Sequence, residues 1–137
     1  MKDNWKLTGR IVSGAKKAAF FTQLDWVQEQ CADKLGFRPY PGTLNIEIYE
    51  ESVPVLEALQ KAEGIKLIPP DPEFCTAGAL PLSLGEETGA IIIPAEDVRI
   101  HGKNIVEVMA PLRLKDALNL NDGDSITINV KRPRLEK

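Results

Sequence analysis

The stretch PGTLNIEIY, residues 41–49, decides the fold, because it joins a tight turn to a strictly alternating strand. Proline fixes the first central position of a turn and glycine tolerates the conformation that follows, so Pro41-Gly42 predicts a reversal of the chain. After the turn, every second residue is apolar, which predicts a strand with one buried face. The apolar positions are Leu44, Ile46 and Ile48, and the polar positions are Thr43, Asn45 and Glu47.

Short apolar segments on both sides of this strand predict further strands. They lie at residues 7–13, 65–68, 74–82, 90–93, 105–109 and 125–130. Helical spacing or helix-forming composition predicts two or three short helices, at residues 23–35, 53–63 and 112–120. Because the helices do not alternate with the strands, the pattern favours a mainly β fold, a small β-barrel, over a parallel βαβ sheet. Closure into a barrel also manages the exposed edges of so small a sheet.

Length and composition indicate one domain over residues 1–137, with a core at about 7–130 and a basic C-terminal tail at 131–137. No apolar run approaches the roughly 20 residues of a membrane span. The first residues lack the apolar segment of a secretory signal, so the expected location is cytoplasmic, with no membrane partner. A net charge of −3 argues against nucleic acid as a partner. Oligomeric state is not predictable from these features.

Cysteine and histidine are too few to suggest a structural zinc ion. The chain has Cys31, Cys75 and a single histidine, His101, all far apart in sequence. Zinc sites commonly need four such ligands at characteristic spacings. Both cysteines are therefore expected to be small apolar fillers in a reducing compartment.

Thr43 and Asn45 are candidate ligands of Mg²⁺. Residues two apart on a strand share a face, so the hydroxyl and the amide oxygen can converge on one point. Mg²⁺ prefers hard oxygen ligands and commonly takes only one or two from the protein, the rest coming from water and substrate phosphates. The alternative is the polar outer face of an ordinary strand.

Two further segments carry groups suited to anions. Gly14, Lys16 and Lys17 lie in a loop that follows the first strand, although the loop lacks the glycine and lysine spacing of a P-loop. Leu112-Arg113-Leu114-Lys115 follows a strand and opens a helix, where backbone N–H groups and basic side chains can receive phosphate. Each segment alone is also compatible with a plain turn or an ordinary helix start.

Glu107 is the one acid inside an otherwise apolar strand, between Val106 and Val108. An ionised carboxylate is costly to bury, so this side chain is expected to face either solvent or a ligand.

The order of these segments resembles the archaeal-type, CTP-dependent riboflavin kinase family. The resemblance runs from about Gly9 to Val130. It rests on GRIVSG at 9–14, KLGFRPYPGTLN at 34–45, GAIIIP at 89–94, VEVMAPLRL at 106–114 and LNDGD at 120–124. The block around Gly36-Phe37 and Thr43-Leu44-Asn45 is the most specific of these, whereas the final Asp-Gly-Asp turn is common elsewhere.

The resemblance implies a six-stranded cradle-loop β-barrel that transfers the γ-phosphate of CTP to riboflavin, giving FMN and CDP. By position, it implies that Thr43 and Asn45 ligate Mg²⁺ and that Glu107 contacts the flavin. It also implies that residues 112–115 line the nucleotide site, with backbone groups reading the base. Phosphoryl transfer needs mainly positioning and charge neutralisation, so few catalytic side chains are expected.

One segment departs from the family pattern. The family typically has a Gly-x-Gly-Glu-Gly loop around the nucleotide, and here that place reads Gly14-Ala15-Lys16-Lys17-Ala18. Loss of glycine hinders close approach of the backbone to phosphate, whereas lysine still attracts phosphate by charge. Besides a kinase, the sequence therefore leaves open a non-catalytic flavin- or nucleotide-binding relative. A barrel that acts through protein or DNA contacts is a third hypothesis, and the acidic net charge argues against it.

Overall fold

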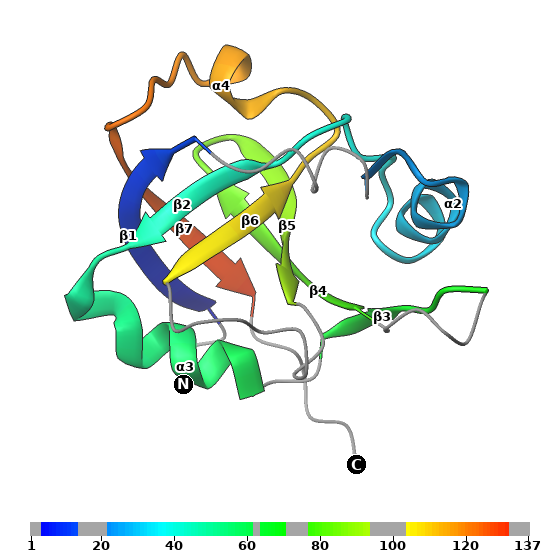
Figure 1. The fold of residues 1–137 in the computed structure, drawn as a ribbon, viewed down its shortest axis with the longest axis horizontal. Helices are drawn as coiled ribbons and strands as arrows, with labels where there is room; N and C mark the ends of the chain where they lie inside the picture. The colour runs from blue at the N-terminus through cyan, green and yellow to red at the C-terminus, as the bar shows by residue number, and fades with distance from the viewer. Residues whose placement is uncertain (1–3, 14–21, 62–63, 71–76, 94–103, 132–137) are drawn as a thin grey trace.

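The computed structural model describes residues 4–13, 22–61, 64–70, 77–93 and 104–131. Within these ranges seven strands are present (Figure 1): β1 Asn4–Val12, β2 Leu44–Ile48, β3 Ile65–Leu67, β4 Ala77–Leu84, β5 Glu87–Ile93, β6 Ile105–Met109 and β7 Ser125–Lys131. The helical elements of the same ranges are α2 Asp25–Lys34, the 3₁₀ turn η1 Glu50–Ser52, α3 Val53–Lys61 and α4 Leu114–Ala117. The mainly β composition with a few short helices is therefore confirmed.

Six of these strands close into an antiparallel barrel. Their order is β4-β5-β6-β2-β1-β7, and β7 pairs back onto β4 through Leu82↔Val130 and Ser83↔Asn129. The seventh strand, β3, extends the sheet by pairing with the first residues of β4. The expected six-stranded barrel is confirmed, with β3 as an addition to it.

Two apolar clusters hold the barrel and its helices together. The larger cluster fills the barrel with alternate residues of its strands, and Leu56 and Leu59 of α3 join it. The smaller cluster packs Val27 and Cys31 of α2 against outward-facing residues of the sheet, among them Met109. In Figure 1, α3 and α4 lie at opposite ends of the barrel and α2 lies to one side.

Cys31 behaves as the expected apolar filler. Its side chain is fully buried, and burial raises the pKa of its thiol to about 11. A thiol with so high a pKa stays protonated and unreactive at neutral pH. Cys75 and His101 lie outside the described residues.

Several elements differ from the sequence-based expectation. β1 and β5 each begin three residues earlier than expected, at Asn4 and Glu87. The helix expected at 112–120 is only the single turn α4, because Asn119 takes a left-handed conformation (φ 56°) that ends it. The strand around Pro81 continues through the proline to Leu84, and residues 74–76 of the expected strand lie outside the described residues. β4 pairs with β5 on one side and with β3 and β7 on the other. On this second side, Pro81 falls between the residues that pair with β3 and those that pair with β7. A residue without an N–H is tolerated where the ladder changes partner.

Gly9 lies where β1 and β2 of the barrel approach each other closely. A Cβ atom at this position would lie 2.3 Å from the backbone oxygen of Glu47 and 2.8 Å from a methyl carbon of Ile46. We expect Gly9→Ala to destabilise the fold by about 1–3 kcal/mol, because the backbone of β2 has to shift. Urea unfolding measures this loss. The control is Arg10→Ala, which removes only an exposed ion pair to Glu47 and should cost under about 1 kcal/mol. Equal losses in the two variants would contradict the predicted close contact.

The last two expectations concern the division of the chain into core and tail, and the lack of a membrane span. The division into a core at 7–130 and a basic tail at 131–137 stays a prediction, although Lys131 already belongs to β7. In the part of the chain that the structure describes, no helix is both long and apolar enough to cross a membrane.

Candidate functional site

A pocket opens beside the start of β2, the end of β6 and the segment that leads into α4. It contains about 460 Å³ of empty space, including the part open to solvent. Thr43 and Leu44 line it from β2 and its approach, and Val108 and Ala110 from the end of β6. The remaining lining residues are Tyr40, Pro41, Gly42, Leu112, Arg113, Leu114 and Lys115. The structure therefore brings the expected metal ligand Thr43 together with the expected nucleotide segment 112–115.

The turn that carries Thr43 into this pocket is fixed from two sides. The backbone N–H of Tyr40 donates to the carbonyl of Ala110 (2.7 Å), which ties the turn to the end of β6. The backbone N–H of Gly42 donates to the hydroxyl of the fully buried Thr22 (2.9 Å). Gly42 has a φ of +124°, which L-residues with side chains rarely adopt, so glycine is needed at this point.

Helix α2 supports the same turn through one amide. The side-chain nitrogen of Gln28 donates to the carbonyls of Thr22 (2.6 Å) and Pro39 (2.8 Å). A side chain that bridges two loop carbonyls restricts both loops, so α2 helps to set the position of Thr43.

Thr43, Asn45 and Glu107 gather on the outer face of the barrel. Asn45 lies directly opposite Glu107 in the β2–β6 ladder, and its side chain is buried. The hydroxyl of Thr43 donates to a carboxylate oxygen of Glu107 across 3.4 Å, a long hydrogen bond. Since the neighbours Leu44, Val106 and Val108 point into the barrel core, the three polar side chains share the opposite face. Glu107 thus faces polar groups rather than open solvent alone.

Burial raises the pKa of Glu107 above its ordinary value of 4.5, and the hydrogen bond from Thr43 opposes that rise. The folded state therefore binds this proton more tightly than the unfolded state, and the contribution of Glu107 to stability falls as the pH rises above about 4.5. We expect Glu107→Gln to gain stability relative to the unsubstituted protein between about pH 4 and pH 7. Urea unfolding at both pH values measures the difference. A difference that is the same at both pH values would contradict the raised pKa.

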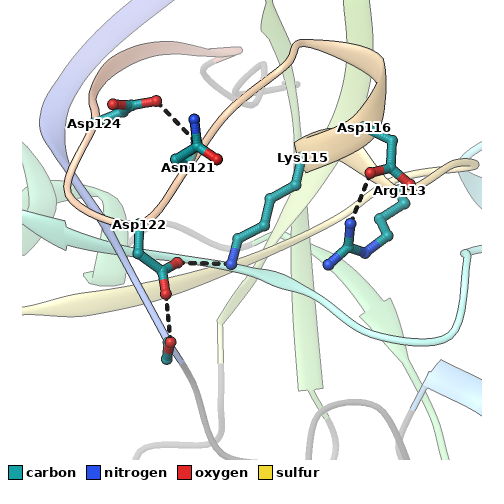
Figure 2. A network of polar contacts seen from close by, with 7 residues as sticks. Arg113, Lys115, Asp116, Asn121, Asp122 and Asp124 are labelled. Atoms are coloured by element: carbon teal, nitrogen blue, oxygen red, sulfur yellow. Dashed lines mark hydrogen bonds and ion pairs between the residues drawn. The ribbon is translucent and has the colours of Figure 1, made fainter.

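In the segment 112–115, Arg113 and Lys115 carry positive charge, whereas the side chains of Leu112 and Leu114 are packed and leave only their backbone groups for a ligand. Leu114 is 4% exposed and packs in the barrel core, and Leu112 packs against the same cluster. Arg113 and Lys115 carry the positive charges, and each is engaged by an acid. The guanidinium of Arg113 lies 2.7 Å from Asp116, and the ammonium of Lys115 lies 2.7 Å from Asp122 (Figure 2). Both basic side chains are thus held in place at the rim of the pocket.

Comparison with known proteins identifies the family. The family model CTP-dep_RFKase, described as domain of unknown function DUF120, matches residues 11–130. The chain belongs to this CTP-dependent riboflavin kinase family. The matched range contains every residue of the pocket and of the polar group around Glu107.

Several curated members of the family are similar to the chain, and each is named riboflavin kinase. The protein from Methanobrevibacter smithii is 38% identical over 124 residues, which cover 90% of this chain and 98% of that protein. The protein from Pyrobaculum aerophilum is 33% identical, covering 91% of this chain and 60% of its own length. The protein from Saccharolobus solfataricus is 31% identical, with 91% and 73% covered. The chain thus spans nearly all of the first relative and about 60% of the second.

The loop that follows the first strand suggested three further residues for the nucleotide site. Gly14, Lys16 and Lys17 lie outside the described residues, so their assignment stays a prediction. Ser13, the last described residue before them, hydrogen-bonds to Asp122.

Sequence patterns did not predict the residues that position the turn before Thr43 or the aromatic residue that lines the pocket. Thr22 and Gln28 act through backbone groups of distant loops, and no local pattern indicates such contacts. The sequence pattern assigns no role to Tyr40, yet it lines the pocket and is 41% exposed. The signal that was available is its place directly before Pro41-Gly42 and Thr43.

The donor set on the outer face fits a divalent metal ion of the Mg²⁺ type. The groups are one hydroxyl, one amide and one carboxylate, and hard oxygen donors are what Mg²⁺ prefers. Because Thr43 gives its hydroxyl hydrogen to Glu107, the lone pairs of that oxygen remain available to a cation.

Proposed function

We propose that the chain is a riboflavin kinase that transfers the γ-phosphate of CTP to the 5′-hydroxyl of riboflavin. The 5′-oxygen forms a bond to the γ-phosphorus, and the bond from that phosphorus to the oxygen bridging the β-phosphate breaks. CDP leaves with that oxygen, FMN is the product, and the hydroxyl proton is released. We assign no side chain as the catalytic base.

The observation that carries this proposal is the convergence of three segments at one pocket. Thr43 and the segment 112–115 line it together, and Glu107 accepts a hydrogen bond from Thr43 beside it. Phosphoryl transfer between two small molecules needs their sites to be adjacent, so that the acceptor oxygen lies in line with the transferred group. The similarity to proteins named riboflavin kinase supports the same reaction.

Each group at the site receives a role under this proposal. Thr43 and Asn45 would hold Mg²⁺, which when bound supplies positive charge to the phosphate oxygens. Glu107 would accept hydrogen bonds from riboflavin, which carries N–H and hydroxyl donors. Arg113 and Lys115 would receive the nucleotide, and the backbone of Leu112 and Leu114 would read its base. Gly14, Lys16 and Lys17 would complete the nucleotide site.

A second candidate function is a non-catalytic relative that binds flavin or nucleotide. The observation that favours it is the sequence Gly14-Ala15-Lys16-Lys17-Ala18, in which the family's later glycines are replaced. Such a protein would keep the pocket and lose turnover, because the backbone at 16 and 18 no longer has the freedom of glycine.

One experiment separates the two functions and identifies the donor. The purified protein is incubated with riboflavin, Mg²⁺ and each of CTP, ATP, GTP and UTP in turn, and FMN is measured by fluorescence-detected chromatography. We expect FMN with CTP. FMN with a different triphosphate would retain the kinase and correct the donor. Absence of FMN from all four, together with flavin or nucleotide binding in calorimetry, would favour the non-catalytic relative.

A further inference from the structure

Asp122 connects two segments that are distant in sequence. One of its carboxylate oxygens accepts a hydrogen bond from the hydroxyl of Ser13 (2.6 Å), at the end of β1. The other oxygen accepts from the ammonium of Lys115 (2.7 Å), on α4. Figure 2 shows Lys115 extending from α4 toward Asp122 in the turn before β7. A single carboxylate therefore fixes the distance between the end of β1 and α4.

The turn that presents Asp122 is itself well fixed. Asp124 accepts a hydrogen bond from the backbone N–H of Asn121 (2.8 Å), which closes the turn. The backbone of Ile11 joins the turn to β1, through Ile11 N–H to Asp124 (2.8 Å) and Gly123 N–H to Ile11 (2.7 Å). Asp122 thus projects from a rigid support, and its two partners adapt to it.

Stability alone does not account for this arrangement. The side chains of Lys115 and Asp122 are 26% and 51% exposed, and exposed ion pairs contribute little to folding. What the bridge does determine is where Lys115 points. Its ammonium group has three hydrogens, and Asp122 takes one of them, so donors remain for a ligand in the pocket that Lys115 lines.

We propose that Asp122 is a positioning residue for the nucleotide, which holds Lys115 and the end of β1 at the spacing that the nucleotide requires. The proposal rests on the proposed function, since it takes the pocket beside Lys115 as the nucleotide site. Asp122 touches neither substrate in this scheme. It acts through Lys115, whose charge it aims, and through Ser13, which directly precedes the segment 14–18.

The ionisation state of Asp122 suits this role. The hydrogen bond from Lys115 is the main cause that lowers the pKa of the Asp122 carboxyl, and the hydrogen bond from Ser13 lowers it further. The carboxyl therefore remains ionised throughout the neutral range. An ionised carboxylate accepts at both oxygens at once, as the bridge requires, and charge-assisted hydrogen bonds of this kind are directional.

The test compares nucleotide binding with flavin binding. Calorimetry with CTP and Mg²⁺, and separately with riboflavin, is carried out on the unsubstituted protein and on the variants Asp122→Ala, Asp122→Asn and Ser13→Ala. We expect Asp122→Ala to weaken CTP binding about 10-fold or more, because Lys115 is no longer aimed at the pocket and its own hydrogen bond to CTP is lost, and to leave riboflavin binding within about 2-fold. Asp122→Asn keeps an acceptor for one partner and should recover part of the loss. Ser13→Ala should weaken CTP binding less than Asp122→Ala.

The control is Glu47→Ala, which removes another solvent-exposed ion pair, the one to Arg10 (2.9 Å) between β1 and β2. This variant should bind CTP like the unsubstituted protein. Equal CTP affinity in Asp122→Ala and the unsubstituted protein would overturn the proposal, as would an equal loss for CTP and riboflavin. If no FMN forms but Asp122→Ala still loses CTP affinity selectively, the kinase assignment fails and the role of Asp122 stands. If the unsubstituted protein binds no nucleotide, the role of Asp122 is overturned too.

Discussion

Thr43→Ala combined with Asn45→Ala is expected to lower Mg²⁺-dependent FMN formation by about 100-fold or more, because the groups that place charge at the transferring phosphate are removed. Asn45 lies on the outer face of β2 and Thr43 directly precedes this strand, whereas Leu44 and Ile46 fill the barrel. The substitutions therefore leave the core intact. Steady-state FMN formation measured across a Mg²⁺ titration checks the rate, and thermal unfolding checks the fold.

Two single variants sharpen this result. Thr43→Ser keeps the hydroxyl and should retain most of the activity, whereas Thr43→Val keeps the shape and removes the oxygen. A rate for the double variant equal to that of the unsubstituted protein would eliminate the assigned metal site. Equal rates for Thr43→Ser and Thr43→Val would show that the shape of the side chain matters rather than its oxygen.

Glu107→Ala is expected to weaken riboflavin binding by about 10- to 100-fold, the effect of losing a hydrogen bond to a charged group. Nucleotide binding should change much less, because Glu107 does not line the pocket that contains Arg113 and Lys115. Fluorescence titration of riboflavin and calorimetry with CTP measure the two affinities separately.

The control for this variant is Glu107→Gln, which keeps an acceptor for the hydroxyl of Thr43. If Glu107 serves the flavin through its charge, both variants lose riboflavin affinity. If its main task is to orient Thr43, only the alanine variant changes, and the change appears in Mg²⁺ dependence. Equal losses of riboflavin and nucleotide affinity in Glu107→Ala would contradict the assignment to the flavin.

The local pattern of residues 41–49 was sufficient to predict the geometry around Thr43 and Asn45. Alternation on a strand determines which residues share a face, and the structure places Asn45 beside Glu107 on that face. The isolated acid in an apolar strand likewise indicated that Glu107 is unusual. These features are encoded within a few consecutive residues, so the sequence alone reveals them. The metal and substrate roles of the three residues stay predictions.

The parts that escaped prediction depend on contacts between distant segments. The bridge from Ser13 through Asp122 to Lys115 forms only when β1, α4 and the turn before β7 come together. The early end of α4 depends on the left-handed conformation of Asn119, which periodicity does not report. The order of short strands and helices predicted a small barrel, whereas the pairing of β4 with both β3 and β7 depends on tertiary packing.

The pairing of β1 with β7 determines when the barrel can close during synthesis. These strands form seven residue pairs, from Asn4↔Lys131 to Arg10↔Ser125, and thus join the two ends of the described chain. During synthesis β1 leaves the ribosome long before β7, so it waits without this partner while the intervening strands are added. Contacts between such distant residues also form slowly after synthesis. The β1–β7 ladder therefore cannot form before residue 131 has been synthesised, and a nascent chain lacking β7 should bind no nucleotide.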